Sequence, residues 1–523
     1  MNDPKDFETA IEATGFGLFN LILLSVAIPS CLATVYETST MSYILPSAEC
    51  DLKLDLLDKG ILNAITYAGM ITSAIGWGFI ADTKGRKKVL VFGFLADAVC
   101  AFGGALSQNL ISLMIFKFLG GFSVCGPFAV LMSYMTEFHG TKYRARVMMV
   151  IGMLFSIATL LLPILAWIIL PNTWDYSLFN GLFVIHSWKV FLAVCALPSL
   201  TAGIAYIFLP ETPKFLMSQG RNEEALVVLQ TIYSINCRKP KSTYPFDSLV
   251  EEAPQKINKE DIWTVEKSKG DSEPPANTSF HFLRKGIKQL KPMFSKKYLG
   301  YSLNIYTMQF CILLGLNTIR LWLPQLFTSI EEFKNMQALH GSEGANDLCA
   351  MIDYSVNKAA TIITGSSDTC EVKISDKTYI NTIIVGLSGL GGYFVAGGLI
   401  NALGNKWILI IALTTSGVCG FSMYWTTSSL STLIVSSIYV TVGSIGSTSL
   451  LGIIVNLFPT SLRTMIVSIT MMFGRLGALI GNILFPYFMS LGCLPPFFMV
   501  GCVMFIAVAL GCILPATHKT SLK

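Results

Sequence analysis

Apolar segments recur along this chain and alternate with short polar and charged segments. A helix of about 20 apolar residues is long enough to cross the hydrocarbon core of a bilayer. The pattern therefore predicts an all-α polytopic membrane protein with about twelve transmembrane helices. We expect these helices near residues 17–45, 60–81, 89–108, 110–136, 147–170, 188–209, 299–326, 380–401, 407–426, 431–457, 464–490 and 494–515.

A long polar segment, residues 210–297, divides the predicted helices into two groups of six, and a second long segment, 328–379, lies between the seventh and eighth helices. Segment 238–279 is charged and contains few apolar residues, so we expect much of it to be disordered. Glu223 to Tyr233 has helical periodicity, with Ala225, Leu226, Leu229 and Ile232 on one face. The predicted organisation is an N-terminal six-helix bundle (1–210), a partly disordered cytosolic central loop (211–297), a C-terminal six-helix bundle (298–516) with an outside loop (328–379), and a cytosolic tail (517–523).

The composition agrees with a membrane protein, because 53% of the residues are hydrophobic and only 13% are charged, against about 25% charged residues in soluble proteins. An even number of spans places both termini on one side, and the Lys and Arg of the short loops assign that side to the cytosol. The net charge of +5 reflects those loops, so it does not indicate a nucleic-acid partner. We expect an integral, multi-pass protein of the plasma membrane or an intracellular vesicle membrane, present as a monomer.

The loop between the second and third predicted spans carries a spaced motif. Gly78 to Lys88 reads G-F-I-A-D-T-K-G-R-K-K. Its glycines permit close helix approach and a left-handed turn. A basic loop that only sets the topology needs Lys and Arg but not the spaced Gly, Asp and Gly, and this plainer interpretation stays open. The motif consists of Gly78, Asp82, Gly85, Arg86 and Lys87.

This motif resembles the G-x-x-x-D-x-x-G-R-[RK] loop of the major facilitator superfamily, where it forms a latch between two pseudo-symmetric six-helix bundles. Further stretches resemble the synaptic vesicle glycoprotein 2 family and its insect relatives; they are Tyr43 to Asp51, Ser133 to Phe138, His186 to Leu200 and Leu209 to Phe215. The resemblance implies a gradient-driven transporter that moves a small organic solute by alternating access. A Glu in an apolar wall beside a cation, such as Glu37, suits either proton or cation coupling, and both stay open. The alternative is a non-transporting membrane protein of the same fold that acts as a binding scaffold.

The two halves match at a constant offset of 319 residues, which is typical of transporters built from duplicated bundles. At this offset Asp82 corresponds to Asn401, Glu137 to Asn456 and Arg144 to Arg463. The second half has thus lost charges that the first half keeps. We expect a one-sided cytosolic gate in which Arg86 pairs with Glu137, while Asp82 accepts amides across the interface. The complete predicted gate is Gly78, Asp82, Gly85, Arg86, Lys87, Glu137, Arg144 and Arg463.

Ionisable side chains inside the predicted spans are candidates for substrate binding or coupling, because each one is costly in a bilayer unless it is paired or hydrated. We expect Glu37 and Arg320 to face one another across a central cavity, although a fixed structural pair would also account for them. Arg475 is positioned to bind an anionic group. Lys117 stands where the related family has Arg, and we expect it to extend toward the outer surface. Asp97 is expected to be structural.

Cys349 and Cys370 both lie in the outside loop, so we predict a disulfide between them. Cys50 and Cys493 are also placed outside or nearly so, which leaves another pairing open. The sequence contains no nucleotide-binding loop, metal-ligand cluster or catalytic constellation that we can identify. We therefore expect a protein without cofactors that is not an enzyme.

Overall fold

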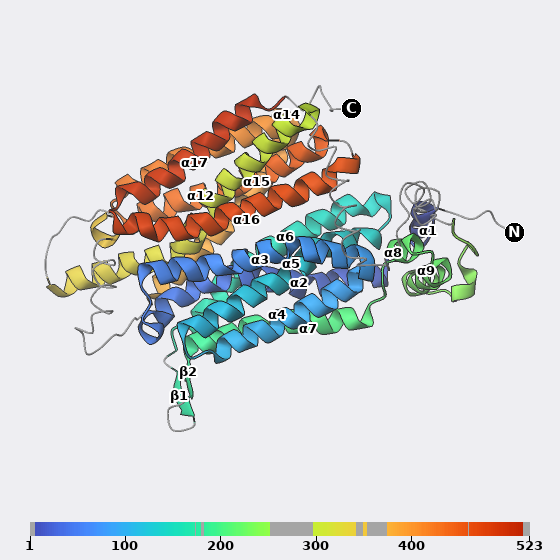
Figure 1. Ribbon diagram of the computed structural model, residues 1–523, viewed down its shortest axis with the longest axis horizontal. Helices are drawn as coiled ribbons and strands as arrows, with labels where there is room; N and C mark the ends of the chain where they lie inside the picture. The colour runs from blue at the N-terminus through green and yellow to red at the C-terminus, as the bar shows by residue number, and fades with distance from the viewer. Residues whose placement is uncertain are drawn as a thin grey trace, which may run out of the picture.

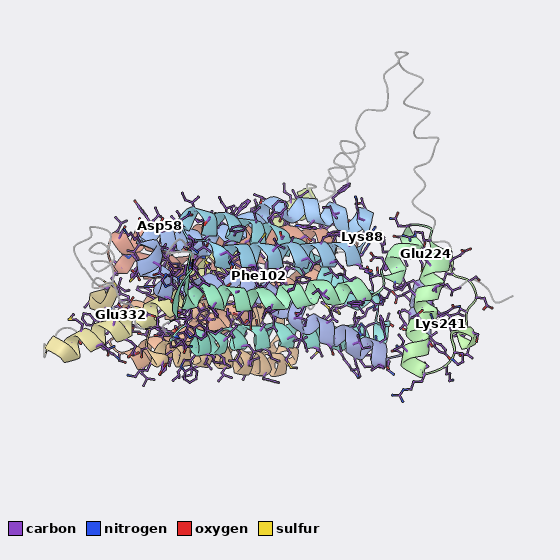
Figure 2. All side chains as sticks on the ribbon, turned by 90° about the horizontal axis from the view of Figure 1, so that it is seen from below. Asp58, Lys88, Phe102, Glu224, Lys241 and Glu332 are labelled. Carbon is purple, nitrogen blue, oxygen red and sulfur yellow. A yellow bond between two sulfur atoms is a disulfide. The ribbon has the colours of Figure 1, made fainter. Side chains whose placement is uncertain are left out.

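The computed structural model describes residues 6–172, 174–178, 183–250, 296–340, 349–352, 374–458 and 460–515. Within these residues, twelve helical segments are long and apolar enough to cross a membrane, which confirms the predicted number. They lie side by side along the long axis of the molecule (Figure 1). Charged residues concentrate toward the two ends: Asp58 and Glu332 lie toward one end, and Lys88 and Glu224 lie toward the other (Figure 2).

The first six spans form one bundle, held together by contacts of α4 with α5 and α7 and of α2 with α6 and α7. A short β-hairpin of β1 (Asp175–Leu178) and β2 (Phe183–His186) extends from its outer end (Figure 1). The helices of this bundle are α2 (Leu18–Leu52), α3 (Leu56–Lys84), α4 (Arg86–Leu106), α5 (Leu110–Glu137), α6 (Thr141–Ile169) and α7 (Ser187–Phe208).

The second bundle repeats this arrangement and packs on the first through α12 against α2, α14 against α6 and α16 against α3. Its elements are α12 (Lys296–His340), α14 (Asp376–Ser422), η3 (Met423–Trp425), α15 (Ser429–Leu457), α16 (Thr460–Ser490) and α17 (Leu494–Ile513). The predicted start of the outside loop at residue 328 is wrong, because α12 continues to His340. Ile330 and Phe333 are buried in the core of this bundle, so the apolar helical face extends beyond the predicted span.

Two glycines confirm the duplication. Gly85 separates α3 from α4 with a φ of 101°, and Gly404 interrupts α14 with a φ of 76°. Their positions differ by the same 319 residues that relate the two halves of the sequence. Because residues with a side chain rarely adopt such positive φ values, both bundles use glycine to make the tight turn between their second and third spans.

A compact helical unit lies beyond the ends of the bundles (Figure 1). It consists of α1 (Phe7–Ala13), α8 (Pro213–Ser218), α9 (Asn222–Cys237) and η1 (Lys241–Thr243). The amphipathic helix predicted within the central loop is α9, and Ala225, Leu229 and Ile232 are buried as expected. Disorder is expected for much of 238–279; residues 238–250 of this segment belong to the folded unit, since Tyr244 and Leu249 are buried in its core, and residues 251–279 lie outside the described residues. The Tyr244 hydroxyl donates a hydrogen bond to the Ala10 carbonyl, 2.7 Å away.

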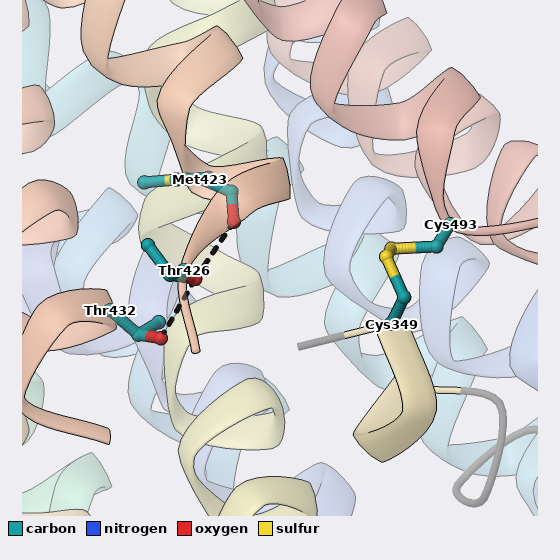
Figure 3. Close-up of a disulfide and its surroundings, with 5 residues drawn as sticks. All are labelled: Cys349, Met423, Thr426, Thr432 and Cys493. Carbon is teal, nitrogen blue, oxygen red and sulfur yellow. Dashed lines mark hydrogen bonds between the residues drawn. A yellow bond between two sulfur atoms is a disulfide. The ribbon is translucent and has the colours of Figure 1, made fainter. Parts of the chain in front are cut away.

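Cys349 forms a disulfide with Cys493 and not with Cys370, which corrects the predicted pairing (Figure 3). Cys493 is the N-cap residue of α17, at the turn that follows α16. Met351 and Ile352 are buried in the core of the C-terminal bundle, and this burial brings Cys349 to the turn. The two Cα atoms are 5.3 Å apart. Cys370 lies outside the described residues.

We predict that non-reducing peptide mapping recovers a cross-linked peptide that contains Cys349 and Cys493. The bridge closes a loop across 144 residues, so Cys493→Ser should lower the free energy of unfolding by about 2–4 kcal/mol. Cys512→Ser is the matched control, because Cys512 is exposed and not disulfide-bonded. Recovery of a Cys349–Cys370 peptide as the main species would contradict the assignment.

Candidate functional site

A buried ion pair lies inside the N-terminal bundle. The Lys117 ammonium on α5 is 2.8 Å from Oε2 of Glu37 on α2 and 3.2 Å from the Glu37 backbone carbonyl. Glu37 is 5% exposed and Lys117 is 1% exposed. A Cβ on Gly120 would come within 2.5 Å of Glu37 Oε1, so this glycine makes room for the carboxylate. The pair is therefore part of the bundle core.

This geometry corrects two expectations. Glu37 does not face Arg320, because its carboxylate turns toward α5. Lys117 does not extend toward the outer surface, because its charge is neutralised within the bundle. A buried charge is tolerated only with an opposite charge and hydrogen bonds, and the helix packing places Lys117 nearest to Glu37.

A third ionisable side chain belongs to the same region. Asp97 on α4 is 1% exposed, and its carboxylate accepts a hydrogen bond from the Ser199 hydroxyl on α7. It lies within electrostatic range of both Glu37 and Lys117. One carboxylate oxygen of Asp97 and one of Glu37 have no hydrogen-bond partner. We call Glu37, Lys117 and Asp97 the buried charge cluster.

Arg320 and Arg475 both lie at the interface between the bundles. Arg320 on α12 lies 3.4 Å from the Thr159 hydroxyl on α6. Arg475 on α16 lies 3.1 Å from the Cys125 sulfur on α5. Both guanidinium groups are within electrostatic range of Tyr67 on α3. Two cations of the C-terminal bundle thus reach side chains of the N-terminal bundle.

Neither arginine has a carboxylate partner among the residues that the structure describes. Both side chains are half-buried. The Arg475 guanidinium lies over the Phe128 ring, 5.4 Å from its centroid, which fixes its orientation while leaving its donors in the plane available. This arrangement can accept an anionic group, because its positive charges are held in a partly dehydrated interface and no carboxylate of the described residues pairs with them.

At the end of the bundles that the sequence analysis assigns to the cytosol, the structure brings Arg86 and Glu137 together, with 3.5 Å between the charged atoms. The Arg86 guanidinium also lies over the Phe215 ring of α8, at 5.2 Å. Arg144 has a different partner, because its guanidinium forms two hydrogen bonds of 2.8 and 3.0 Å with the Glu8 carboxylate of α1. The Arg463 side chain lies outside the part of the chain that the structure describes.

Gly78 and Asp82 do not make the predicted close contacts. A methyl group at Gly78 would meet no atom within 4 Å, and the Asp82 side chain is exposed. Among the described residues, Asp82 has no hydrogen-bond or ion-pair partner. The side chains of Asn401 and Asn456, which correspond to Asp82 and Glu137 in the second bundle, lie outside the described residues, so the contact of Asp82 across the interface stays a prediction.

Glu211 is a residue that the sequence analysis missed. Its carboxylate accepts hydrogen bonds of 3.0 Å from the backbone amides of Arg86 and Lys87 at the start of α4. A Cβ on Gly85 would come within 2.2 Å of this carboxylate. Burial raises the pKa of Glu211, while the amides and the Arg86 guanidinium act to lower it. The acidic residue in L-P-E-T-P, directly after the sixth span, was the available signal.

The family model of the Major Facilitator Superfamily matches residues 14–343 and 359–523. The chain belongs to the major facilitator superfamily. It is therefore an integral, multi-pass membrane protein of a transporter superfamily. The duplicated bundles and the glycine turn after α3 are the structural features that the predicted motif implied.

Curated relatives include synaptic vesicle glycoprotein 2B from Rattus norvegicus, which is 32% identical over 233 residues. Synaptic vesicle glycoprotein 2A from Rattus norvegicus is 31% identical over 235 residues. The first match spans 44% of this chain and 34% of the relative, and the second spans 45% and 32%. The chain thus matches about a third of the length of these relatives.

A solved structure with the same superfamily fold is the partially occluded, inward open conformation of the xylose transporter XylE from E. coli. It covers 95% of this chain and 100% of its own, with a TM-score of 0.63 and 15% sequence identity. The crystal structure of a D-xylose–proton symporter has the same TM-score and identity and covers 96% of this chain and 99% of its own. At this identity the likeness establishes the fold.

We predict that Lys117→Met lowers the free energy of unfolding by about 3–5 kcal/mol, because it leaves the Glu37 carboxylate buried without a cation. The double variant Glu37→Gln/Lys117→Met should recover a large part of that loss, since neither charge remains. The measurement is the thermal unfolding of the purified protein in detergent. Lys142→Met is the control, because Lys142 is exposed. A Lys117→Met protein as stable as this control would contradict the assigned pair.

Proposed function

We propose that this protein carries a small organic anion across the membrane by alternating access. The observation that carries this proposal is the pair of half-buried arginines, Arg320 and Arg475, which reach across the bundle interface without a carboxylate partner among the described residues. Near the middle of a membrane, such charges are retained where they serve a ligand or an ion path. A solute with a carboxylate or a similar anionic group would neutralise them.

The charge balance of the interface supports an anion over a cation. Glu37, the acid expected to face Arg320, forms an ion pair with Lys117 inside the N-terminal bundle. The positive charges of Arg320 and Arg475 at the interface are therefore not neutralised by Glu37. A guanidinium group matches the planar geometry of a carboxylate and can donate two parallel hydrogen bonds to it. The hydroxyls of Tyr43 and Tyr67, both within electrostatic range of Arg320, supply further polar groups for the solute.

The buried charge cluster is the proposed coupling site. Two carboxylates share one ammonium group there, so complete ionisation would leave an uncompensated negative charge inside the bundle. Because an unpaired buried charge is unfavourable, the cluster is suited to hold one proton. Proton release and binding at Glu37 and Asp97 would then couple the cycle to a proton gradient. The D-xylose–proton symporter with the same fold is in line with this proposal.

The cytosolic gate supplies the conformational part of the proposal. In this conformation Asp82 is exposed, while Arg86, Glu137 and Glu211 hold the N-terminal bundle's own end together. We propose that the Asp82 carboxylate accepts hydrogen bonds from the C-terminal bundle when the two bundles close on the cytosolic side. The second bundle would contribute backbone amides and lacks acidic residues at the corresponding positions, which are Asn401 and Asn456.

A binding scaffold of the same fold is the second candidate. The observation that favours it is the folded cytosolic unit of α1, α8, α9 and η1, which Arg144 ties to α6 through Glu8. Such a unit offers a rigid surface to a partner in a plasma or vesicle membrane. A ligand screen separates the two functions, because a solute that binds the folded state at 100 times its Kd stabilises it by about 2.7 kcal/mol.

Uptake into proteoliposomes tests the proposed substrate class. We expect a panel of small carboxylates, and not their neutral amides, to raise the unfolding temperature and to be transported. Arg475→Gln should reduce uptake at least about tenfold, because it removes one bidentate charged contact, and Arg475→Lys should recover only part of it. Arg146→Gln is the control, since Arg146 is exposed at the start of α6. Equal uptake by Arg475→Gln, or a screen without any stabilising solute, would favour the scaffold.

The pH dependence of uptake tests the coupling site. Glu37→Gln keeps an acceptor for Lys117 but removes a proton-binding carboxylate, so transport by this variant should lose its dependence on external pH. Glu49→Gln is the matched control, because Glu49 also lies on α2 in a buried pair, 2.8 Å from Lys59 and outside the cluster. A wild-type pH profile in Glu37→Gln would reject the role of Glu37.

A further inference from the structure

We propose that the α3–α4 turn carries a binding site for an anionic phospholipid of the cytosolic leaflet. The phosphate-bearing headgroup would lie among Lys84, Lys87 and Lys88. One acyl chain would lie in the apolar groove beside Trp77 and Phe92. This site is separate from the bundle interface, so it does not depend on the identity of the transported solute.

Two adjoining cavities form the proposed site. The first is a cavity of about 600 Å³ between the turn and the cytosolic unit, and it is lined by the three lysines together with Glu211, Phe215 and residues of α9. The second is a groove of about 260 Å³ whose lining is Trp77, Ile80, Lys84, Lys88, Val89 and Phe92. Lys84 and Lys88 line both, so a polar and an apolar compartment meet at these two side chains.

The charges of the first cavity leave an excess of positive charge. Glu211 is held by the backbone amides of Arg86 and Lys87. Glu224 is paired with Arg221. The remaining ionisable groups in the lining are Glu223 and the three lysines, none of which has an ion-pair partner among the described residues. Lys84, Lys87, Lys88 and Arg221 together carry four positive charges, and Glu211, Glu223 and Glu224 carry three negative ones, so one positive charge is unbalanced.

The position of two of these lysines on α4 adds to the local positive charge. Lys87 and Lys88 lie in the first turn of α4, where the helix dipole is positive and acidic residues are preferred. The first turn of α4 contains no acidic residue. An anion bound there would interact favourably with the lysines, while the amides at the helix end already donate to Glu211. Figure 2 shows Lys88 at the end of the bundle next to the helix that carries Glu224.

The groove identifies the anion as a lipid. Phe92 is 67% exposed and Ile80 is 36% exposed, and both lie on membrane-spanning helices. Apolar side chains at this depth face acyl chains, whereas Lys84 and Lys88 reach the headgroup level. The cytosolic leaflet is rich in anionic lipids that bind clustered lysines near the surface. A soluble phosphate would use the lysines but not the groove.

Native mass spectrometry of the full chain tests the site with equal amounts of phosphatidylserine, phosphatidylethanolamine and phosphatidylcholine. We expect preferential retention of phosphatidylserine. The variant Lys84→Gln/Lys87→Gln/Lys88→Gln should bind it at least about tenfold more weakly, because each surface lysine contributes to the attraction of anionic lipid. The control is Lys142→Gln/Lys239→Gln/Lys241→Gln, which removes three exposed lysines on the same side of the protein and outside both cavities.

Fluorescence provides a second measurement that needs no lysine variant. Trp77 lines the groove, so its emission, isolated as the difference between wild type and Trp77→Phe, should be quenched more by brominated phosphatidylserine than by brominated phosphatidylcholine at the same mole fraction. Equal quenching by the two lipids would overturn the proposal. So would undiminished retention of phosphatidylserine by the triple-lysine variant, or equally strong binding of water-soluble glycerophosphoserine.

Discussion

A charge inside a bilayer must be paired or must face water, and this constraint decides which polar groups of the protein are structural and which are free to act. Lys117 and Glu37 satisfy it within one bundle, through a contact of 2.8 Å in a site closed to solvent. Arg320 and Arg475 satisfy it differently, by lying half-buried at the interface of the two bundles. The same requirement thus produces the buried charge cluster inside one bundle and the two half-buried arginines at the interface, for which we propose coupling and binding roles.

The cytosolic end shows how a short motif gains its structural meaning. Gly85 makes the turn with a positive φ. Because Gly85 has no side chain, the Glu211 carboxylate can approach the amides at the start of α4. Arg86 then joins this turn to Glu137 on α5 and to Phe215 on α8. Turn, cap and ion pair are therefore one interaction network, which holds the first bundle rigid while Asp82 stays exposed.

The two bundles keep the same backbone design but differ in charge. Gly404 adopts the positive φ of Gly85, whereas Asn405 stands where the first bundle has Arg86. Backbone geometry is retained because the tight turn tolerates little besides glycine. Side-chain charges at the turn are not required for the turn itself, so one bundle can lose them. This asymmetry leaves the basic turn, and the lipid contact proposed for it, to the N-terminal half alone.

The sequence by itself determined the number of spans, the duplication at 319 residues, the amphipathic helix α9 and the types of residue in the interface. These follow from local periodicity and length, since an apolar run of sufficient length has few alternatives in a membrane. Only the tertiary structure decided the partners: Lys117 and not Arg320 for Glu37, Cys493 and not Cys370 for Cys349, and Glu8 for Arg144. Partners depend on helix rotation and packing between segments far apart in the chain, and neither hydropathy nor spacing encodes that rotation.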